Sequence, residues 1–452
     1  MFDLDSLPPE IFAGIFEAGV LTWGIGFLVP VCLVRKSWSD IVATTPHLWG
    51  IITITTTTKD IDSLHAQLMK AKACPLTVIC SVNPNQAKKP LQAVLNRVVA
   101  LSPNWVRAEA STQLLSRCRG SEMHSLQELR LWTFGRTIAG DEFPDTDIAK
   151  FGSLPNLRCL TASNVPSWWI THLLSRSITY LHLLFRLRES ETLPNASGYF
   201  SRVPEVRVLK LTKFPPEDVS SNLLPPVHLA KLTTLELSHV AHPSRILCQI
   251  FAPSLQTLSI RHSGGIYRPL SYLTIDHAPE FAPLSTFFSQ WSQVDFLPLR
   301  LSTLELVECL QIDDVAYLIR WLARLPSLVR LVLLDDAIGR AAQLQSPTEE
   351  TNILRVLASP HGAGNHAKGW LCPSLTHLHL ATDLILMDLI GVAHARGGIA
   401  TSLSSASPPS RLRSITAPLC PNGGHDEIEQ LKGLVDNVWC VCLGCEFTLP
   451  GM

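Results

Sequence analysis

Charged residues are scarce in this chain. Asp, Glu, Lys and Arg make up 17% of the 452 residues, whereas hydrophobic residues make up 46%. This composition excludes disorder for most of the length, because disordered segments combine low hydrophobicity with high charge. The 37 basic and 38 acidic side chains nearly cancel, to a formal net charge of −1. Without an excess of positive charge, we expect no nucleic-acid partner.

Motifs of common enzymes and cofactor sites are missing. The sequence has no G-x-S-x-G elbow, no phosphate-binding G-x-x-x-x-G-K-[S/T] loop, no H-E-x-x-H motif and no pair of C-x-x-C motifs. The acidic pairs Asp313-Asp314 and Asp335-Asp336 are interpreted as solvated loop carboxylates. His361 and His366 lie in a glycine-rich stretch with no cysteine at metal-ligand spacing. We therefore expect no enzymatic activity and no cofactor.

Cysteines are too few and too irregularly spaced for a disulfide-stabilised scaffold, with 12 in the whole chain. The first residues are acidic where a secretory signal would be basic, so we predict reduced thiols and a cytoplasmic and/or nuclear location. One cluster near the C-terminus contains Cys440, Cys442 and Cys445. Together with Cys420 and His425 it could supply zinc ligands, whereas a final strand with buried cysteines is the simpler alternative. The sequence leaves this choice open.

The longest apolar stretch lies near the N-terminus. Residues 11–34 contain one charged side chain, Glu17, and are long enough to span a bilayer. A proline and several glycines, among them Gly19, would interrupt a continuous helix. The spacing instead predicts short amphipathic helices, the first ending at Gly19 and the next within Val29–Val42. We therefore expect no membrane span, and a strand is predicted from Gly50.

A repeated leucine pattern dominates the chain beyond residue 100. Its spacing is leucine, two residues, leucine, one residue, leucine, with some replacement by Val, Ile or Ala. Many copies follow a turn with proline and a polar residue, such as Leu154-Pro155-Asn156. A further match, Leu270-Leu273-Ile275, falls too close to its predecessor and stays unassigned. The assigned copies are Leu126-Leu129-Leu131, Leu157-Leu160-Ala162, Ile178-Leu181-Leu183, Val206-Leu209-Leu211, Leu232-Leu235-Leu237, Leu255-Leu258-Ile260, Leu301-Leu304-Leu306, Leu328-Leu331-Leu333, Leu375-Leu378-Leu380 and Leu412-Ile415-Ala417.

These repeats predict an α/β fold with a parallel ladder of short strands. One strand and its return segment cannot cover their own apolar face, so leucines of neighbouring copies must pack against one another in a continuous core. Five leucines are expected in neighbouring parallel strands of that core: Leu235, Leu258, Leu304, Leu331 and Leu378.

Residues between the core leucines should point to the opposite, concave face of the ladder. Side chains alternate along a strand, which places Glu236, Glu305 and His379 on that face. These three residues are our candidates for contacts with a target protein. Residues 339–370 and 397–411 lack the leucine pattern and are predicted to be insertions.

The first fifty residues resemble an F-box. The segment Leu7-Pro8-Pro9-Glu10-Ile11 is similar to its opening, Leu33-Val34-Arg35-Lys36-Ser37-Trp38 to its second half, and Thr45-Pro46-His47-Leu48-Trp49 to its close. Arg35 stands where the family usually has cysteine, and residues 20–24 are apolar where the family has a polar loop. With the repeats, the layout resembles the F-box proteins of mushroom-forming (basidiomycete) fungi.

The resemblance implies a small N-terminal helical F-box (1–50), a linking segment (51–104) and an irregular leucine-rich-repeat solenoid, or horseshoe (105–452). It implies a substrate-recognition adaptor of an SCF-type (cullin-RING) ubiquitin ligase, whose F-box docks to the ligase's adaptor subunit while the repeats bind an unknown target protein. The alternative is a leucine-rich-repeat interaction module that acts outside a ubiquitin ligase. The residues that match the family's contact elements are Leu7, Pro8, Ile11, Ile15, Val34, Trp38, Leu48 and Trp49.

Overall fold

The chain has a mixed α/β fold with two compact units, Met1–Phe185 and Arg186–Met452, and each is described by itself. Fourteen of the described strands form the long parallel ladders, six in the first unit and eight in the second, and β8 and β10 form a separate short parallel pair. The computed structural model describes residues 7–56, 58, 60–71, 73–118, 120–133, 154–185, 196–214, 226–240, 242–262, 283–293, 300–335, 337–338, 352–359, 370–380, 386–397, 408–417 and 425–440.

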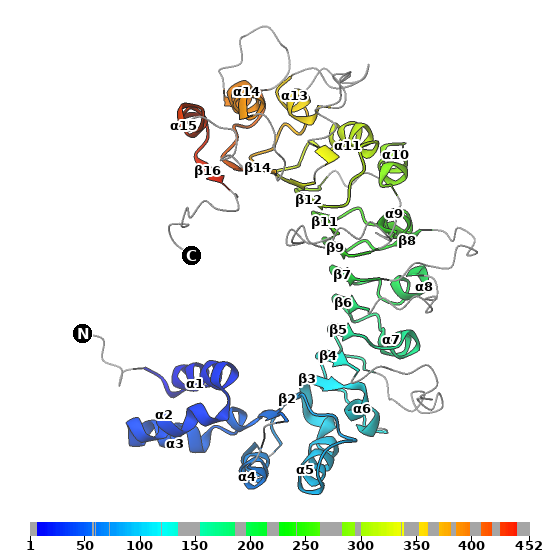
Figure 1. Ribbon diagram of the computed structural model, residues 1–452. Helices are drawn as coiled ribbons and strands as arrows, with labels where there is room; N and C mark the ends of the chain where they lie inside the picture. Colours follow the sequence, from blue (N-terminus) through cyan, green and yellow to red (C-terminus); the bar gives the residue numbers. More distant parts are fainter. Residues whose placement is uncertain are drawn as a thin grey trace, which may run out of the picture. The chain divides into compact units, whose positions relative to one another are not determined.

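The first unit begins with an N-terminal helical segment, residues 7–50 (Figure 1). A proline and Glu10 lie in the first turn of α1, where they suit the unpaired N–H groups and the positive end of the helix dipole. Short helices follow α1, as the apolar spacing predicts. The elements are α1 (Pro9–Trp23), η2 (Ile25–Phe27), α2 (Leu28–Val34), α3 (Lys36–Thr44) and η3 (Pro46–Trp49).

The predicted end of the first helix at Gly19 is wrong. Helix α1 continues to Trp23 and ends at Gly24, whose φ of 79° suits glycine. Gly19 is instead buried inside α1, against the ring of Phe27. A Cβ atom at this position would clash with that ring, so glycine serves close packing here. No helix among the described residues is long and apolar enough to cross a membrane.

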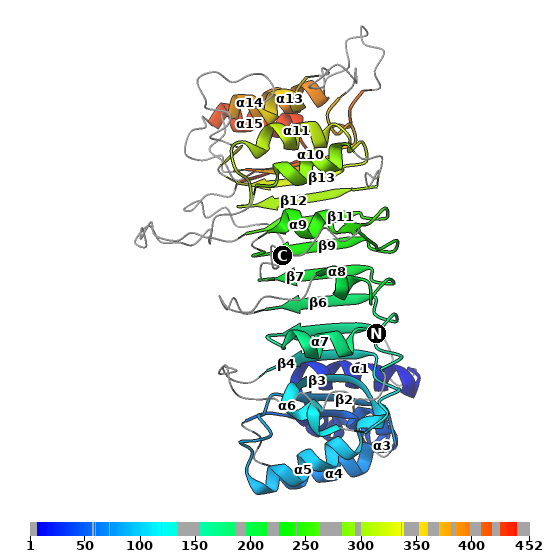
Figure 2. The same ribbon diagram turned by 90° about the vertical axis from the view of Figure 1, so that its right-hand side faces the viewer.

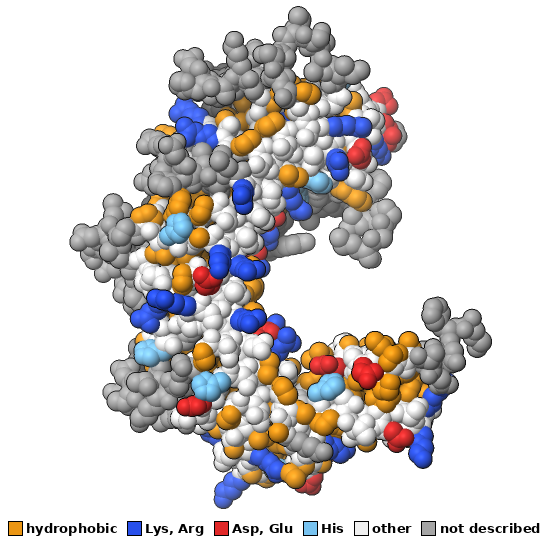
Figure 3. Space-filling model, turned by 180° about the vertical axis from the view of Figure 1, so that it is seen from behind, with side chains coloured by type: hydrophobic (Ala, Val, Ile, Leu, Met, Phe, Trp, Pro, Cys, Tyr) orange, Lys and Arg blue, Asp and Glu red, His pale blue; other side chains and the backbone are white. Residues whose placement is uncertain are grey.

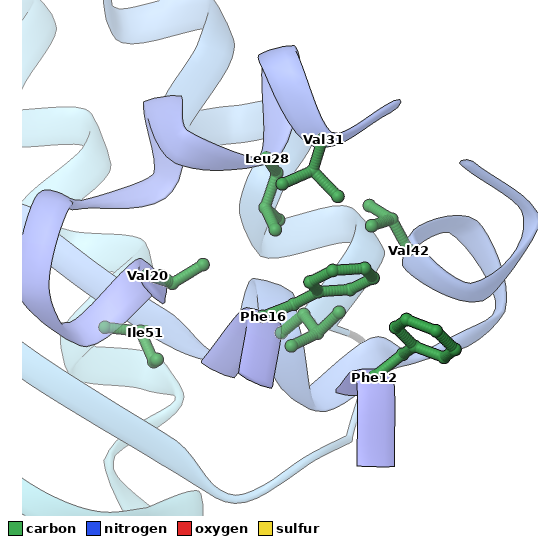
Figure 4. Close-up of a cluster of buried hydrophobic side chains, with 8 residues drawn as sticks. Phe12, Phe16, Val20, Leu28, Val31, Val42 and Ile51 are labelled. Carbon is green, nitrogen blue, oxygen red and sulfur yellow. The ribbon is translucent and has the colours of Figure 1, made fainter. Parts of the chain in front are cut away.

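The helices of this segment share one apolar core (Figure 4). Helix α1 contributes the rings of Phe12 and Phe16. Both rings contact Trp38 of α3, Phe12 at a tilted angle and Phe16 edge-on. Trp49 encloses the core further, since its Nε1 donates a hydrogen bond of 3.0 Å to the Val42 carbonyl. The buried members of the core are Phe12, Phe16, Val20, Leu28, Val31, Val42, Leu48 and Ile51.

A parallel ladder follows in the same unit, with its strands in sequence order. It starts earlier than the leucine pattern indicates, because two strands lie within residues 51–104. Helices α6 and α7 lie on one side of the ladder (Figure 1). The strands are β1 (Ile51–Ile54), β2 (Leu76–Cys80), β3 (Trp105–Ser111), β4 (Glu128–Trp132), β5 (Cys159–Ser163) and β6 (Tyr180–Leu184), and the helices are α4 (Ile61–Ala71), α5 (Lys89–Ala100), η4 (Ser102–Asn104), α6 (Thr112–Leu115), η5 (Ser116–Cys118) and α7 (Ser167–Leu173).

Helix α4 ties the helical segment to the first strand. The buried Gln67 side chain donates hydrogen bonds of 2.7 Å to the Ile51 carbonyl and 3.2 Å to the Trp49 carbonyl. The Lys70 ammonium lies 3.8 Å from the centroid of the Trp49 ring. Because Ile51 belongs both to β1 and to the helical core, the two parts of this unit pack directly against each other.

The second unit repeats the strand-and-return arrangement. Helices α8 to α11 lie on one side of its strands (Figure 1), and the strands stack side by side (Figure 2). Its ladder consists of β7 (Val208–Thr212), β9 (Thr234–Ser238), β11 (Thr257–Arg261), β12 (Thr303–Val307), β13 (Arg330–Leu334), β14 (His377–Leu380), β15 (Ser414–Ala417) and β16 (Asn437–Cys440). The other elements are α8 (Ala196–Phe200), β8 (Val227–His228), α9 (Pro243–Cys248), β10 (Ile250–Phe251), α10 (Ser285–Gln293), α11 (Asp314–Leu322), α13 (Ile353–Leu357), α14 (Leu386–Gly397) and α15 (His425–Leu434).

The five core leucines predicted from the repeats lie in register, which confirms that prediction. Leu258 pairs with Leu235 on one side and Leu304 on the other, and the row continues to Leu331 and Leu378. None of the five is more than 1% exposed. Alternation of buried and partly exposed residues along the strands gives each ladder one core face and one open face, which is formed by the residues between the core leucines.

Backbone hydrogen bonds recur at the same point of successive repeats. The proline-containing turns close as predicted: Leu328 N–H donates to the Leu325 carbonyl, and Leu255 N–H to the Ala252 carbonyl. A left-handed residue follows several strands, as at His239 (φ 56°) and Glu308 (φ 49°). The N–H of each donates to the last strand residue of the next repeat. Each repeat therefore satisfies polar backbone groups of its neighbour.

The interpretation of the acidic pairs as solvated carboxylates is wrong for Asp314 and Asp335. Both side chains are buried and accept backbone hydrogen bonds. Asp314 accepts from Gln311 N–H and Ser285 N–H at 2.9 and 2.6 Å. Burial raises the pKa of Asp314, and these hydrogen bonds oppose the shift. Asp313 is exposed, as expected, and Asp336 lies outside the described residues.

Candidate protein-interaction surfaces

Exposed apolar side chains are concentrated on the N-terminal helical segment. Figure 3 shows hydrophobic side chains gathered there. Of eleven large apolar side chains that are strongly exposed in the described parts of the chain, seven lie between residues 11 and 34. A concentration of exposed apolar side chains in one segment makes it a candidate interaction site. The seven are Ile11, Ile15, Leu21, Trp23, Val29, Leu33 and Val34.

Helix α1 has apolar residues on two faces. Phe12 and Phe16 point into the core, whereas Ile11 and Ile15 are 50% and 53% exposed. Pro8, directly before the helix, is also exposed. An isoleucine pair one turn apart on the solvent side adds nothing to the core of this segment, so its apolar surface is available to a partner helix or groove.

The eight predicted contact residues fall into two groups. Pro8, Ile11, Ile15 and Val34 are exposed and can reach a partner. The other four pack against or within the helical core. Leu48 is fully buried, and Leu7, Trp38 and Trp49 are partly buried against the core. These four residues therefore belong mainly to the interior packing that supports the exposed side chains.

Two exposed residues on α2 are absent from the predicted contact residues, although the matched motif includes Leu33. Val29 is 64% exposed and Leu33 is 82% exposed, one helical turn apart. Val31, between them, is buried. The helical spacing of Val29 and Leu33 was a usable signal, but an apolar helix of seven residues does not reveal from sequence which side faces solvent.

The open face of the second unit carries the three predicted target-contact residues. Glu236, Glu305 and His379 occupy equivalent positions on β9, β12 and β14, between buried leucines. Ser259 and Val332 fill the positions on β11 and β13 in the same row. Glu236 forms an ion pair of 2.8 Å with Lys210 of β7. The sequence prediction of outward side chains at these positions is therefore confirmed.

Glu305 is the centre of a charged group on this face. It pairs with Arg261 and accepts a hydrogen bond of 3.1 Å from the Ser259 hydroxyl. Burial alone would raise the pKa of Glu305. The hydrogen bond and charge of Arg261, the Ser259 hydrogen bond and the charge of Arg330 outweigh that effect, so its pKa lies below the ordinary value.

His379 lies near the same group. Burial lowers the pKa of His379, the charge of Arg330 lowers it further, and Glu305 offsets part of the shift. The imidazole is therefore neutral at neutral pH. Arg330 influences both Glu305 and His379 while its own side chain is exposed to solvent.

The open face of the first unit carries balanced charges. Arg107 and Arg130 both pair with Glu128, at 2.7 and 3.2 Å. Glu109 lies opposite Arg130 in the strand register. Two arginines thus face two glutamates, which leaves no net charge among these residues.

No metal-binding group of His, Cys, Asp or Glu occurs within the ranges that the structure describes. Cys440 lies at the end of β16, so a final strand is present at the position where one was expected. The remaining candidate zinc ligands lie outside the described side chains: Cys420, His425, Cys442, Cys445, His361 and His366. So do Leu270-Leu273-Ile275 and much of both predicted insertions.

Comparison with known proteins assigns no family. No protein-family model matches the chain, and no curated protein matches it significantly.

Proposed function

We propose that the chain is a substrate-recognition adaptor of an SCF-type ubiquitin ligase. In this proposal the N-terminal helical segment is an F-box that docks to the ligase's adaptor subunit. The strand ladders form a leucine-rich-repeat solenoid that holds a target protein on its open face. The protein performs no chemistry itself and brings the target to the ligase.

The exposed apolar surface between residues 11 and 34 carries the proposal. Ile11 and Ile15 on α1, with Val29 and Leu33 on α2, expose apolar area that this segment does not bury against its own core. Docking into an apolar groove would remove that area from water, at roughly 25 cal/mol for each Å². The F-box resemblance covers the same residues.

The repeat geometry supports the second half of the proposal. Leucines in register and recurring interstrand hydrogen bonds are what a stacked array of repeats requires. Such an array presents an extended surface whose side chains vary without disturbing the core. Glu236, Glu305 and His379 on that surface are proposed to contact the target.

The experiment is co-purification of the full-length chain with the adaptor subunit. The test variant is Ile15→Asp, at a side chain that is 53% exposed on α1. Its matched control is Met387→Asp, at a side chain that is 56% exposed on α14 of the second unit. We expect the first variant to lose the adaptor subunit and the control to retain it, with both proteins folded.

Retention of the adaptor subunit by the Ile15→Asp protein would refute the assigned docking surface. Failure of the unmodified chain to co-purify would refute the ligase role and favour an interaction module that acts elsewhere.

A further inference from the structure

We propose that the open face of β11–β14 binds an acidic segment of the target protein, with a carboxylate side chain seated on Arg330. This inference rests on the proposed function, because it names the chemistry of the partner that the repeat array would capture. The surface lies wholly within the second unit and requires no residue of the first.

Charges on the open face of the second unit cancel except at Arg330. Lys210 pairs with Glu236, and Arg261 pairs with Glu305. The open-face residues of β15 and β16 are uncharged. Among the described strand residues of this unit, Arg330 is the open-face charged side chain without an ion pair of its own, and the nearby Glu305 carboxylate is paired with Arg261.

The surroundings of Arg330 determine what kind of anion fits. Its guanidinium is exposed, and its register neighbours are Thr303 on β12 and His377 on β14. Farther along the same strand, Val332 is buried and Leu334 is partly exposed. A planar guanidinium binds a carboxylate through two parallel hydrogen bonds. A ligand with an exposed acidic residue therefore complements this part of the face.

Nucleic acid is disfavoured by the same charge pattern. A phosphate backbone needs several cations in a row, and its binding energy comes from the ions that they displace. Here the carboxylate of Glu305 lies close to Arg330, and Glu236 lies on the same row of the face. Closely spaced phosphates would meet both carboxylates, whereas a single side-chain carboxylate on Arg330 would lie near Glu305 alone, whose charge Arg261 pairs.

The test is selection of short random peptides, displayed on phage, against the full-length protein. Three proteins are compared: the unmodified chain, Arg330→Glu, and the control Arg245→Glu, which reverses an exposed charge on α9. We expect Asp and Glu to be enriched in peptides selected by the unmodified chain and the control, but not by Arg330→Glu. A selected peptide should lose about tenfold or more in affinity for Arg330→Glu and for Arg330→Ala.

Two further measurements keep the outcomes separate. Circular dichroism and co-purification with the adaptor subunit, on the same preparations, should be unchanged by either arginine variant. Loss of co-purification by the unmodified chain would count against the ligase role and not against the peptide site. Absence of acidic enrichment, or equal enrichment with Arg330→Glu, would overturn the site. Binding of a labelled oligouridylate that Arg330→Glu abolishes would replace the acidic segment by nucleic acid.

Discussion

Replacement of Leu304 by alanine should destabilise the second unit strongly. Leu304 is a fully buried residue of β12, between Leu258 and Leu331 in the register. Its neighbouring strands are fixed by backbone hydrogen bonds on both sides, so the cavity left by the truncation cannot collapse freely. We therefore expect a loss at the upper end of the range for buried leucines, about 3–5 kcal/mol.

The assay is urea denaturation followed by circular dichroism, together with hydrogen exchange of peptides that cover β11–β13. Exchange is needed because a chain with two compact units need not unfold in one step. The control is Thr303→Ala, one residue earlier on the open face, which should change the unfolding free energy by no more than about 1 kcal/mol. Equal, small losses from both variants would refute a continuous leucine core at β12.

Three further predictions concern buried polar groups and close packing. Asp335→Ala should lower the unfolding free energy by about 2–4 kcal/mol, because the N–H of Leu310 and a second buried backbone N–H lose their acceptor; Asp335→Asn, which keeps an acceptor oxygen, should recover part of that loss in urea denaturation. Gly19→Ala should destabilise the helical segment, because the new methyl group clashes with Phe27, and thermal melting should show a lower midpoint. Glu305 has a lowered pKa, so its stabilising contribution is present above the ordinary glutamate value of 4.5 and is lost as the pH falls through the lower folded-state value. The difference in urea midpoint between the unmodified chain and Glu305→Gln should accordingly shrink on acidification, and a constant difference would contradict this explanation.

The strands and turns of the ladder could be predicted because their signals are local. Alternation of leucines sets which side chains are buried, and a proline before a polar residue favours the turn that precedes the strand. Both signals act within one repeat, as the turn from Leu325 to Leu328 and the adjoining strand β13 illustrate.

Features that depend on distant contacts could not be predicted in this way. Gly19 stays inside α1 because Phe27 packs on it, and no helix-ending rule contains that contact. Asp335 is buried because a backbone N–H of the preceding repeat, that of Leu310, donates to it. Strand β1 was predicted from its β-branched residues, but β2 was missed because valine and cysteine take the place of core leucines there.

The candidate docking surface was predictable in outline only. Sequence motifs identified the segment in which exposed apolar side chains are concentrated and four of its exposed residues, Pro8, Ile11, Ile15 and Val34. The predicted contact residues also included Leu48, whose burial follows from helix packing, and omitted Leu33, the most exposed of the large apolar side chains in the described parts. Which face of a short apolar helix meets solvent is decided by tertiary packing and not by spacing alone.

The most direct test of the account is calorimetric titration of the full-length chain with the purified adaptor subunit. We predict an equimolar complex with a negative heat-capacity change, since binding buries apolar side chains of α1 and α2. The double variant Ile11→Asp/Ile15→Asp should weaken binding by about 2 kcal/mol or more. Absence of binding by the unmodified chain, or equal affinity of the double variant, would contradict the proposal that this surface docks the chain to a ubiquitin ligase.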